Sequence, residues 1–110
     1  YNRLNDMYFG PEMEDDGYIR YEWSRIPHFY RGFYVYQYAT GYSAATAISA
    51  KILSEGKEAR DSYIEFLKSG SSDYPVELLK IAGVDMASPQ PVKMAMETFK
   101  SLVDELEKML

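Results

Sequence analysis

The sequence of 110 residues contains no cysteine and only one histidine. Without cysteine, disulfide bonds, thiolate nucleophiles and cysteine-ligated zinc are all excluded. A single histidine cannot supply the two zinc-binding histidines of an H-E-x-x-H motif, and that motif is absent, so no metal ligand is assigned to this chain. The lack of cysteine fits a reducing compartment, and we expect a cytoplasmic protein.

Positive charge and long apolar runs are also scarce. The chain has 12 Lys and Arg against 17 Asp and Glu, a formal net charge of -5. Because that balance repels a phosphate backbone, we expect no nucleic-acid partner. No apolar run approaches the roughly 20 residues of a membrane-spanning helix, and we expect no membrane association. The chain starts at Tyr1 without an initiator Met, which predicts a processed product or a piece of a longer protein.

The residues that are present favour helices throughout the chain. The alanine-rich stretch 42–56, closed by Gly56, predicts the second half of one long central helix that begins after Pro27. Residues 33–38 also suit a strand, because β-forming residues alternate there, but the alanines that follow favour the helix. Shorter amphipathic helices are expected at 1–9, 57–68, 75–83 and 91–110. The predicted fold is therefore an all-α subdomain that comprises residues 1–110.

Apolar spacing predicts which side chains of these helices are buried. The helix at 57–68 is expected to bury Ala59, Tyr63, Phe66 and Leu67. The last helix is expected to bury a longer stripe, made of Met94, Ala95, Phe99, Leu102, Val103, Leu106 and Leu110. In the central helix, Phe29, Tyr30 and Phe33 are interpreted as core.

His28 is the first candidate for chemistry, although a lone histidine is more often a structural or surface residue. Pro27 fixes the backbone just before it, and Gly32, four residues on in a helix, would leave the surface beside the imidazole uncovered. A substrate has room to lie there, and an imidazole can donate a hydrogen bond to a developing oxyanion. His28 is therefore a candidate oxyanion donor.

Three tyrosines that follow His28 form the second candidate. Tyr34, Tyr36 and Tyr38 point in different directions around a helix, so one narrow buried stripe cannot hold them all. A phenol with a pKa of about 10 stays protonated at neutral pH and suits hydrogen-bond donation. The run of small residues from Gly41 to Ala45 predicts close helix packing, with a close backbone approach or a slight kink at Gly41.

Three segments together resemble the C-terminal region of oligoendopeptidase F, a zinc metallopeptidase of the wider thimet-oligopeptidase superfamily. They are "EWSRIPHFYRGFYVYQYATGYSAATAI", "YIEFLKSGSSDYPVELLKIAGVDM" and the closing "PVKMAMETFKSLVDELEKML". The resemblance runs from about Tyr8 to the end of the chain. It implies a helical enzyme whose channel admits short peptides, and whose zinc is held by H-E-x-x-H and a further Glu.

Carried onto this sequence, the resemblance assigns oxyanion stabilisation to His28 and to Tyr38, with Tyr36 second and Tyr34 third among the tyrosines. Tyr34, Gly32 and Gly41 are the expected substrate-binding positions. The zinc motif of the family lies N-terminal to the matching region and is missing here. The resemblance thus implies a C-terminal fragment, inactive alone, that requires zinc and the N-terminal remainder of the enzyme.

Two other interpretations remain at this point. A free-standing helical module would use the tyrosine surface to bind a peptide or protein without catalysis, and a purely structural bundle would use it as an aromatic core. An H-E-x-x-H motif upstream of this chain favours the peptidase over the module. An excised subdomain is also expected to self-associate through apolar surface that its parent covers.

Overall fold

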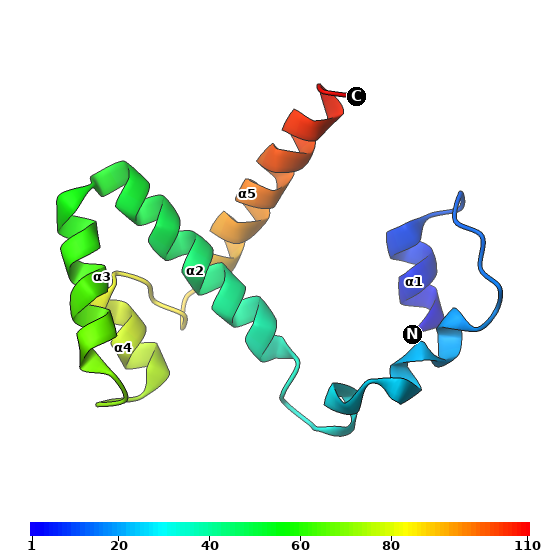
Figure 1. The fold of residues 1–110 in the computed structure, drawn as a ribbon, viewed down its shortest axis with the longest axis horizontal. Helices are drawn as coiled ribbons and strands as arrows, with labels where there is room; N and C mark the ends of the chain where they lie inside the picture. The colour runs from blue at the N-terminus through cyan, green and yellow to red at the C-terminus, as the bar shows by residue number, and fades with distance from the viewer. The chain divides into compact units, whose positions relative to one another are not determined.

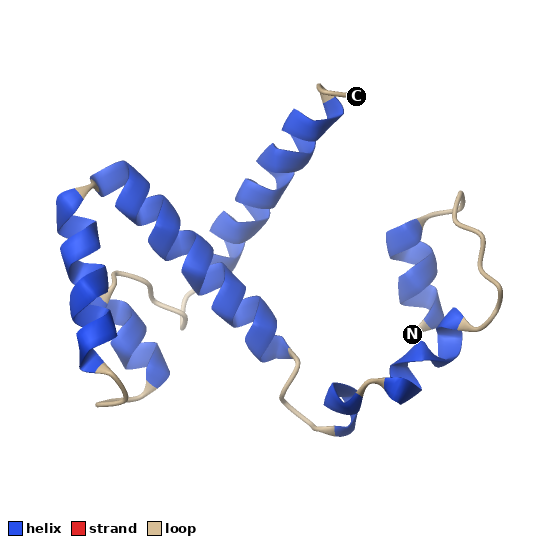
Figure 2. Cartoon of the chain, viewed as in Figure 1, coloured by secondary structure: helices blue, strands red, loops and turns tan.

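The protein is helical in every part, as the sequence predicts. The structure is a computed structural model that describes residues 1–110, and it contains helices, turns and loops but no strand (Figure 1, Figure 2). In chain order the elements are α1 (Asn2–Phe9), the 3₁₀ helices η1 (Ile19–Arg25) and η2 (Pro27–Tyr30), α2 (Tyr36–Glu55), α3 (Lys57–Ser69), α4 (Pro75–Ile81) and α5 (Gln90–Glu107). The all-α prediction is confirmed. The chain divides into two compact units, residues Tyr1–Tyr36 and Gln37–Leu110.

The first unit holds together through a few aromatic and polar contacts rather than through a core. None of its residues is buried. The ring of Tyr1, just before α1, meets the ring of Phe29 in η2 edge to face, with 6.4 Å between centroids. The hydroxyl of Tyr30 donates a 2.6 Å hydrogen bond to the carbonyl of Ser24, which ties η2 to η1. Phe29 and Tyr30 therefore brace η2 on its neighbours.

The long helix begins later than the sequence predicts. Pro27 opens only the short η2, and Arg31 after it has extended backbone, with φ -115° and ψ 119°. Phe33 has φ 56°, which a right-handed helix does not allow. Aromatic and β-branched side chains also lose rotamer freedom in a helix, and they dominate residues 33–36. The helix predicted from Pro27 is therefore wrong for residues 31–35, and α2 starts at Tyr36.

The same segment corrects the predicted aromatic core. Phe29, Tyr30 and Phe33 are exposed by 50%, 68% and 94%. Without a continuous helix, their spacing does not place them on one side. The spacing of aromatic residues indicates a shared face only where the segment is one helix. Here the rest of the first unit leaves the three side chains largely exposed.

The core of the second unit is built around α2. Ser43, Ala44, Ala47 and Ile48 are the buried residues of this helix. The alanines and Ile48 form one cluster with Ala82 and Val84, which follow α4. Tyr63 and Phe66 of α3 pack against that cluster, with their own ring centroids 6.2 Å apart. Within the small-residue run, Ser43 and Ala44 are buried, whereas Gly41, Tyr42 and Ala45 are exposed, so the close packing expected of the run is limited to two residues.

Glycine ends α2 at the predicted position. Gly56 has φ 72°, a left-handed conformation that residues with a Cβ rarely adopt. Its N–H donates a 2.9 Å hydrogen bond to the carbonyl of Ile52, and the chain then turns directly into α3. At Gly41 an added Cβ would meet nothing within 4 Å, and α2 continues through this position. The close backbone approach expected at Gly41 is therefore absent.

The apolar stripes of α3 and α5 are buried only in part. In α3, Ala59 is buried and Tyr63 and Phe66 are half-buried, whereas Leu67 is exposed. In α5 only Pro91 and Ala95 are buried. The rest of the predicted α5 stripe is exposed or half-buried, and the helix runs away from α2 towards its C-terminal end (Figure 1). No helix of the protein combines the length and apolar character needed to cross a membrane.

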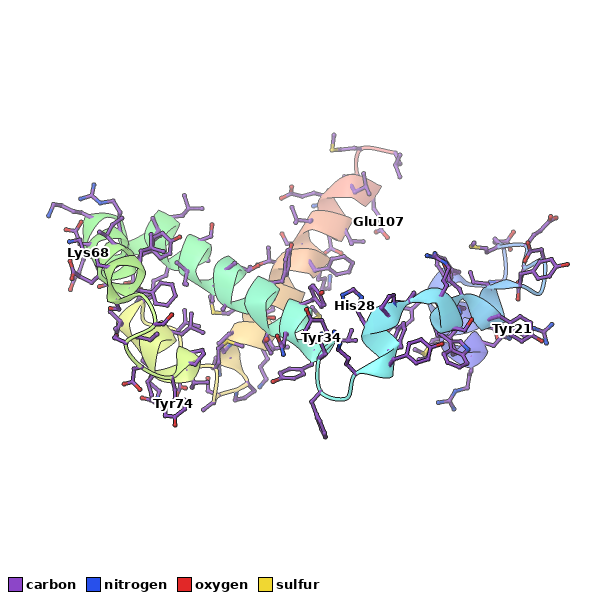
Figure 3. All side chains as sticks on the ribbon, turned by 60° about the horizontal axis from the view of Figure 1, so that its bottom comes forward. Tyr21, His28, Tyr34, Lys68, Tyr74 and Glu107 are labelled. Carbon is purple, nitrogen blue, oxygen red and sulfur yellow. The ribbon has the colours of Figure 1, made fainter.

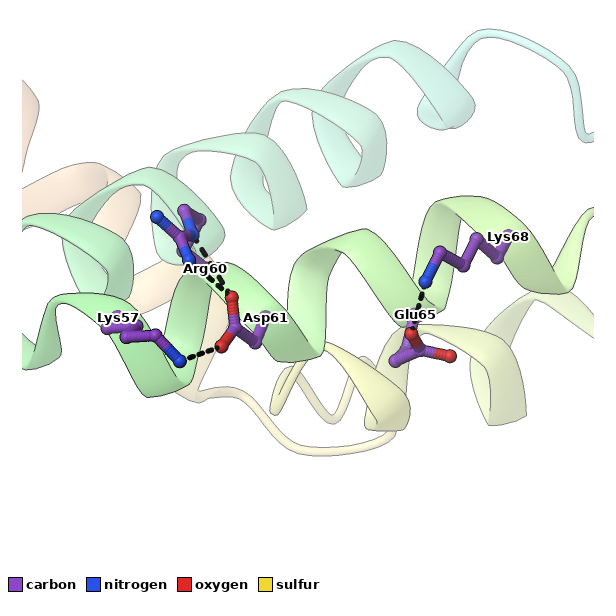
Figure 4. Close-up of polar contacts among 5 residues, drawn as sticks. All are labelled: Lys57, Arg60, Asp61, Glu65 and Lys68. Atoms are coloured by element: carbon purple, nitrogen blue, oxygen red, sulfur yellow. Dashed lines mark hydrogen bonds and ion pairs between the residues drawn. The ribbon is translucent and has the colours of Figure 1, made fainter.

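Exposed ion pairs line the outer surface of α3 (Figure 4). Asp61 accepts hydrogen bonds from Lys57 at 2.9 Å and from Arg60 at 2.7 Å, and Lys68 binds Glu65 at 2.7 Å. The pKa of Asp61 is lowered mainly by the hydrogen bond from Lys57 and next by the hydrogen bond from Arg60. The hydrogen bond to Asp61 in turn raises the pKa of Lys57. These pairs are open to water, so each stabilises the helix only slightly.

Candidate functional site

His28 lies on the surface of the first unit, inside η2. Pro27 occupies the first position of this short helix, where its fixed φ suits the turn. Phe29 and Tyr30, the next two residues, are tied to Tyr1 and Ser24 as described above. The backbone of His28 is therefore braced from both sides, while its imidazole remains exposed.

The imidazole of His28 stacks on the ring of Tyr34. The ring centroids are 5.4 Å apart and the planes are inclined by 25°, so the two rings are stacked with an offset (Figure 3). The guanidinium of Arg31 lies 5.9 Å from the centroid of the same tyrosine ring. Aromatic pairs of this geometry contribute about 0.5–1.5 kcal/mol beyond their burial. Tyr34 is half-buried, and its ring restricts the orientation of the His28 imidazole.

Tyr36 and Tyr38 stand in the first turn of α2. Their side chains are exposed by 59% and 58%. Tyr38 belongs to the second unit, and the helical period places it on the side of α2 opposite the buried Ala47. Both side chains are therefore largely exposed to solvent.

The glycines expected to contact substrate have open surroundings. A Cβ added at Gly32 would meet nothing within 4 Å. The helical spacing that was expected to place Gly32 beside His28 does not exist, because residues 31–35 are not helical. The space at Gly32 is therefore real, but the reason derived from the sequence is wrong.

No group of three or more His, Asp and Glu side chains is arranged to hold a metal ion. The residues of this chain therefore do not fit a zinc site. What the chain does offer is a set of exposed hydrogen-bond donors of two kinds, the imidazole of His28 and the phenols at the start of α2. Such donors stabilise negative charge on an oxygen that they reach.

Two residues near these positions were missed in the sequence. Arg31 is one of them, and no sequence signal indicates its cation–π contact with Tyr34, because residues 31–35 do not follow a helical spacing. Tyr42 was treated as part of the small-residue run, although it lies one helical turn after Tyr38. Its side chain is exposed by 69% on the same side of α2.

This chain belongs to peptidase family M3, whose sequence signature matches residues 1–98. Among curated relatives, oligopeptidase PepF of Bacillus subtilis is 59% identical over 110 residues, which are 100% of this chain and 16% of that protein. An oligoendopeptidase F homolog of Lactococcus lactis is 46% identical over the same length and is covered to 18%.

A solved structure agrees with the sequence relatives. The crystal structure of oligoendopeptidase-F from Enterococcus faecium superposes with a TM-score of 0.83 at 50% identity, and the match covers 98% of this chain and 21% of that one. The resemblance to oligoendopeptidase F found in the sequence is therefore confirmed. The chain spans less than a fifth of the length of the curated relatives named above.

Proposed function

We propose that this chain is the C-terminal helical part of a zinc-dependent oligoendopeptidase that hydrolyses short peptides in the cytoplasm. The observation that carries the proposal is the identity of 59% over the whole chain to an oligopeptidase. Zinc and its H-E-x-x-H motif would come from the rest of the enzyme, since the residues present here do not suit the metal. The chain alone would then have no hydrolytic activity.

The proposed role of this chain is to stabilise the oxyanion that forms when the scissile carbonyl is attacked. His28 and Tyr38 would each donate a hydrogen bond to that oxygen, with Tyr36 as the alternative phenol. Support comes from the exposure of the imidazole and of both phenols. Tyr34, which stacks on His28, and the open positions Gly32 and Gly41 would contact the peptide.

Substitution in an enzyme of full family length that contains this chain tests the role of Tyr38. Tyr38→Phe removes one donor that acts in the transition state, so kcat should fall roughly 10²- to 10³-fold while KM hardly changes. His28→Ala should behave similarly, and the double variant should lose less than the product of the two losses, because both donors serve one oxygen.

The matched control is Tyr74→Phe, which removes the same hydroxyl from a tyrosine that is 80% exposed at the start of α4. Its kcat should equal that of the parent enzyme. Normal kcat in Tyr38→Phe would transfer the role to Tyr36 or Tyr34. The proposed oxyanion site would be refuted by normal rates in His28→Ala and in the Phe variants of Tyr34, Tyr36 and Tyr38.

The 110-residue chain alone is the second comparison. It should bind no stoichiometric zinc by elemental analysis and should cleave no quenched peptide. Chelator-sensitive turnover by this chain would contradict the fragment interpretation. Peptide binding without hydrolysis by the enzyme of full length would favour instead a non-catalytic binding module that uses the same tyrosine surface.

A further inference from the structure

The His28 imidazole stacks on a tyrosine ring in a unit that has no buried core. None of residues 1–36, the first unit, is buried, and the His28 side chain is exposed. Its stacking partner Tyr34 lies six residues later along the chain. A surface side chain loses rotamer freedom when it is fixed in one orientation, and contacts must offset that loss. The orientation of the imidazole therefore depends on the contacts that hold the Tyr34 ring.

The backbone turn that brings Tyr34 beside His28 is strained at one residue. Phe33 has φ 56°, a left-handed conformation that costs free energy for a bulky side chain. The Phe33 side chain is 94% exposed, so its own packing does not offset this cost. Gly32 before it has no side chain to contribute. The turn therefore needs contacts from its other residues.

Arg31 makes such a contact from within the same turn. Its guanidinium carbon lies 5.9 Å from the centroid of the Tyr34 ring. The face of an aromatic ring carries negative charge density and attracts a cation at this distance. The backbone N–H of Arg31 also donates a 3.4 Å hydrogen bond to the carbonyl of His28. Arg31 is thus joined to both members of the stack, to Tyr34 by its side chain and to His28 by its backbone.

We propose that Arg31 is a positioning residue for peptide hydrolysis: its guanidinium holds the Tyr34 ring in place, and the ring holds the His28 imidazole in the orientation that serves the oxyanion. This inference rests on the proposed role of His28. A donor that must reorient during the reaction loses part of its stabilising effect on the transition state. Loss of the Arg31 cation should therefore lower kcat and leave substrate binding unchanged.

The test begins with Arg31→Gln in the holoenzyme of full family length. Glutamine removes the charge but keeps a long polar side chain and the backbone hydrogen bond to His28. A cation–π contact at an exposed site corresponds to about a two- to fivefold change in an equilibrium constant, so kcat should fall by about this factor while KM hardly changes. Arg31→Lys keeps a cation that can lie over the ring and should restore most of kcat.

The matched control is Arg20→Gln, because Arg20 makes the same kind of contact with another ring of the first unit. Its guanidinium carbon lies 5.6 Å from the centroid of Tyr21. This variant removes the same charge from an aromatic ring that does not stack on His28, and its kcat should equal that of the parent enzyme. An equal fall of kcat in Arg20→Gln and Arg31→Gln would overturn the inference.

Double variants show whether Arg31 acts through the stack. Tyr34→Leu has no ring, so adding Arg31→Gln should cause no further loss of kcat, whereas in Tyr34→Phe, which keeps the ring, the loss should persist. Arg31→Gln should also have no effect on the residual kcat of His28→Ala. The same loss in all of these backgrounds would overturn the inference, because Arg31 would then act on the substrate directly.

Nuclear magnetic resonance of the imidazole gives a measurement that does not depend on turnover. In the full-length enzyme with ¹³C-labelled histidine, the His28 signal is the one that disappears in His28→Ala. The ring current of Tyr34 displaces this signal, so Arg31→Gln should move it towards its position in Tyr34→Leu, and Arg20→Gln should not. An unmoved signal in Arg31→Gln, or a moved signal with normal kcat, would overturn the role of Arg31 alone. Normal kcat in His28→Ala would refute instead the premise about His28.

Discussion

Substitution of Ile48 by Ala measures how much the core on α2 stabilises the second unit. Ile48 is 8% exposed and is a large aliphatic member of a cluster otherwise made mainly of alanines. The change removes three buried carbon groups, each worth about 0.8 kcal/mol, and leaves a cavity. We therefore expect a loss of about 3 kcal/mol in the free energy of unfolding.

That loss is large for a unit of this size. About 1 kcal/mol shifts Tm by roughly 4–8 °C in a domain of 60–100 residues, so Tm should fall by at least about 12 °C. Thermal and urea unfolding of the chain, followed by far-ultraviolet circular dichroism, gives both quantities. The urea m-value should stay constant if the variant loses stability without changing the native fold.

Leu53→Ala is the matched control, because it shortens an aliphatic side chain of the same helix on the opposite face. Leu53 is 85% exposed, so the substitution should change the free energy of unfolding by less than about 0.5 kcal/mol. Equal losses in the two variants would refute the assignment of buried and exposed faces to α2. A loss below about 1 kcal/mol in Ile48→Ala would show that the alanine-rich cluster is not the stabilising core.

Two further predictions concern α5 and α3. In α5 more than half of each of three apolar side chains is exposed, those of Phe99, Leu102 and Leu106. The chain should therefore self-associate as its concentration rises, as measured by sedimentation velocity, and Leu102→Asp should abolish the association. A strictly monomeric parent chain would contradict this prediction. The lowered pKa of Asp61 stabilises the fold above its unfolded value of about 4, and this stabilisation is lost as the pH falls through the folded value. Asp61→Asn should therefore lower Tm slightly at pH 7 and not at pH 2, and an equal difference at both pH values would refute the ion pair with Lys57 as its cause.

The helix ends were predictable because their signals are local. Gly56 has a positive φ and closes α2, and Pro75 occupies the first position of α4. Each of these residues restricts its own backbone whatever surrounds it. Helices α3 and α4 therefore appear within one or two residues of their predicted bounds.

The segment between η2 and α2 was not predictable in the same way. The left-handed backbone of Phe33 is unusual for a bulky side chain, and no sequence pattern announces it. The aromatic spacing of residues 29–40 fits a helix as well as the alanine stretch does. Only the observed backbone shows that the helical period starts at Tyr36.

The residue types of the candidate site are a prediction from the sequence, whereas its contacts come only from the structure. The single histidine and the crowded tyrosines already indicated hydrogen-bond donors, and the resemblance to the family ranked Tyr38 before Tyr34. The stacking of His28 on Tyr34, and the position of Arg31 over the same ring, depend on a turn that the sequence did not reveal. Tyr34 therefore lies beside His28 whichever phenol donates to the oxyanion.

Aromatic residues lie both in α2 and in the segment before it, but only those in α2 stand on a helix with buried residues on its opposite side. Ala44, Ala47 and Ile48 fix one side of α2 against the core, so the side that carries Tyr38 and Tyr42 is held outward. A donor that must meet an oxyanion without rearrangement needs such a rigid support, because reorganisation during the reaction would cost part of the stabilisation. Phe29 and Tyr30 have no comparable core beneath them and serve to brace His28 instead. The oxyanion role proposed for Tyr38 therefore depends on the buried residues Ala44, Ala47 and Ile48 of the same helix, and Ile48→Ala in the enzyme of full length is expected to lower kcat as well as Tm.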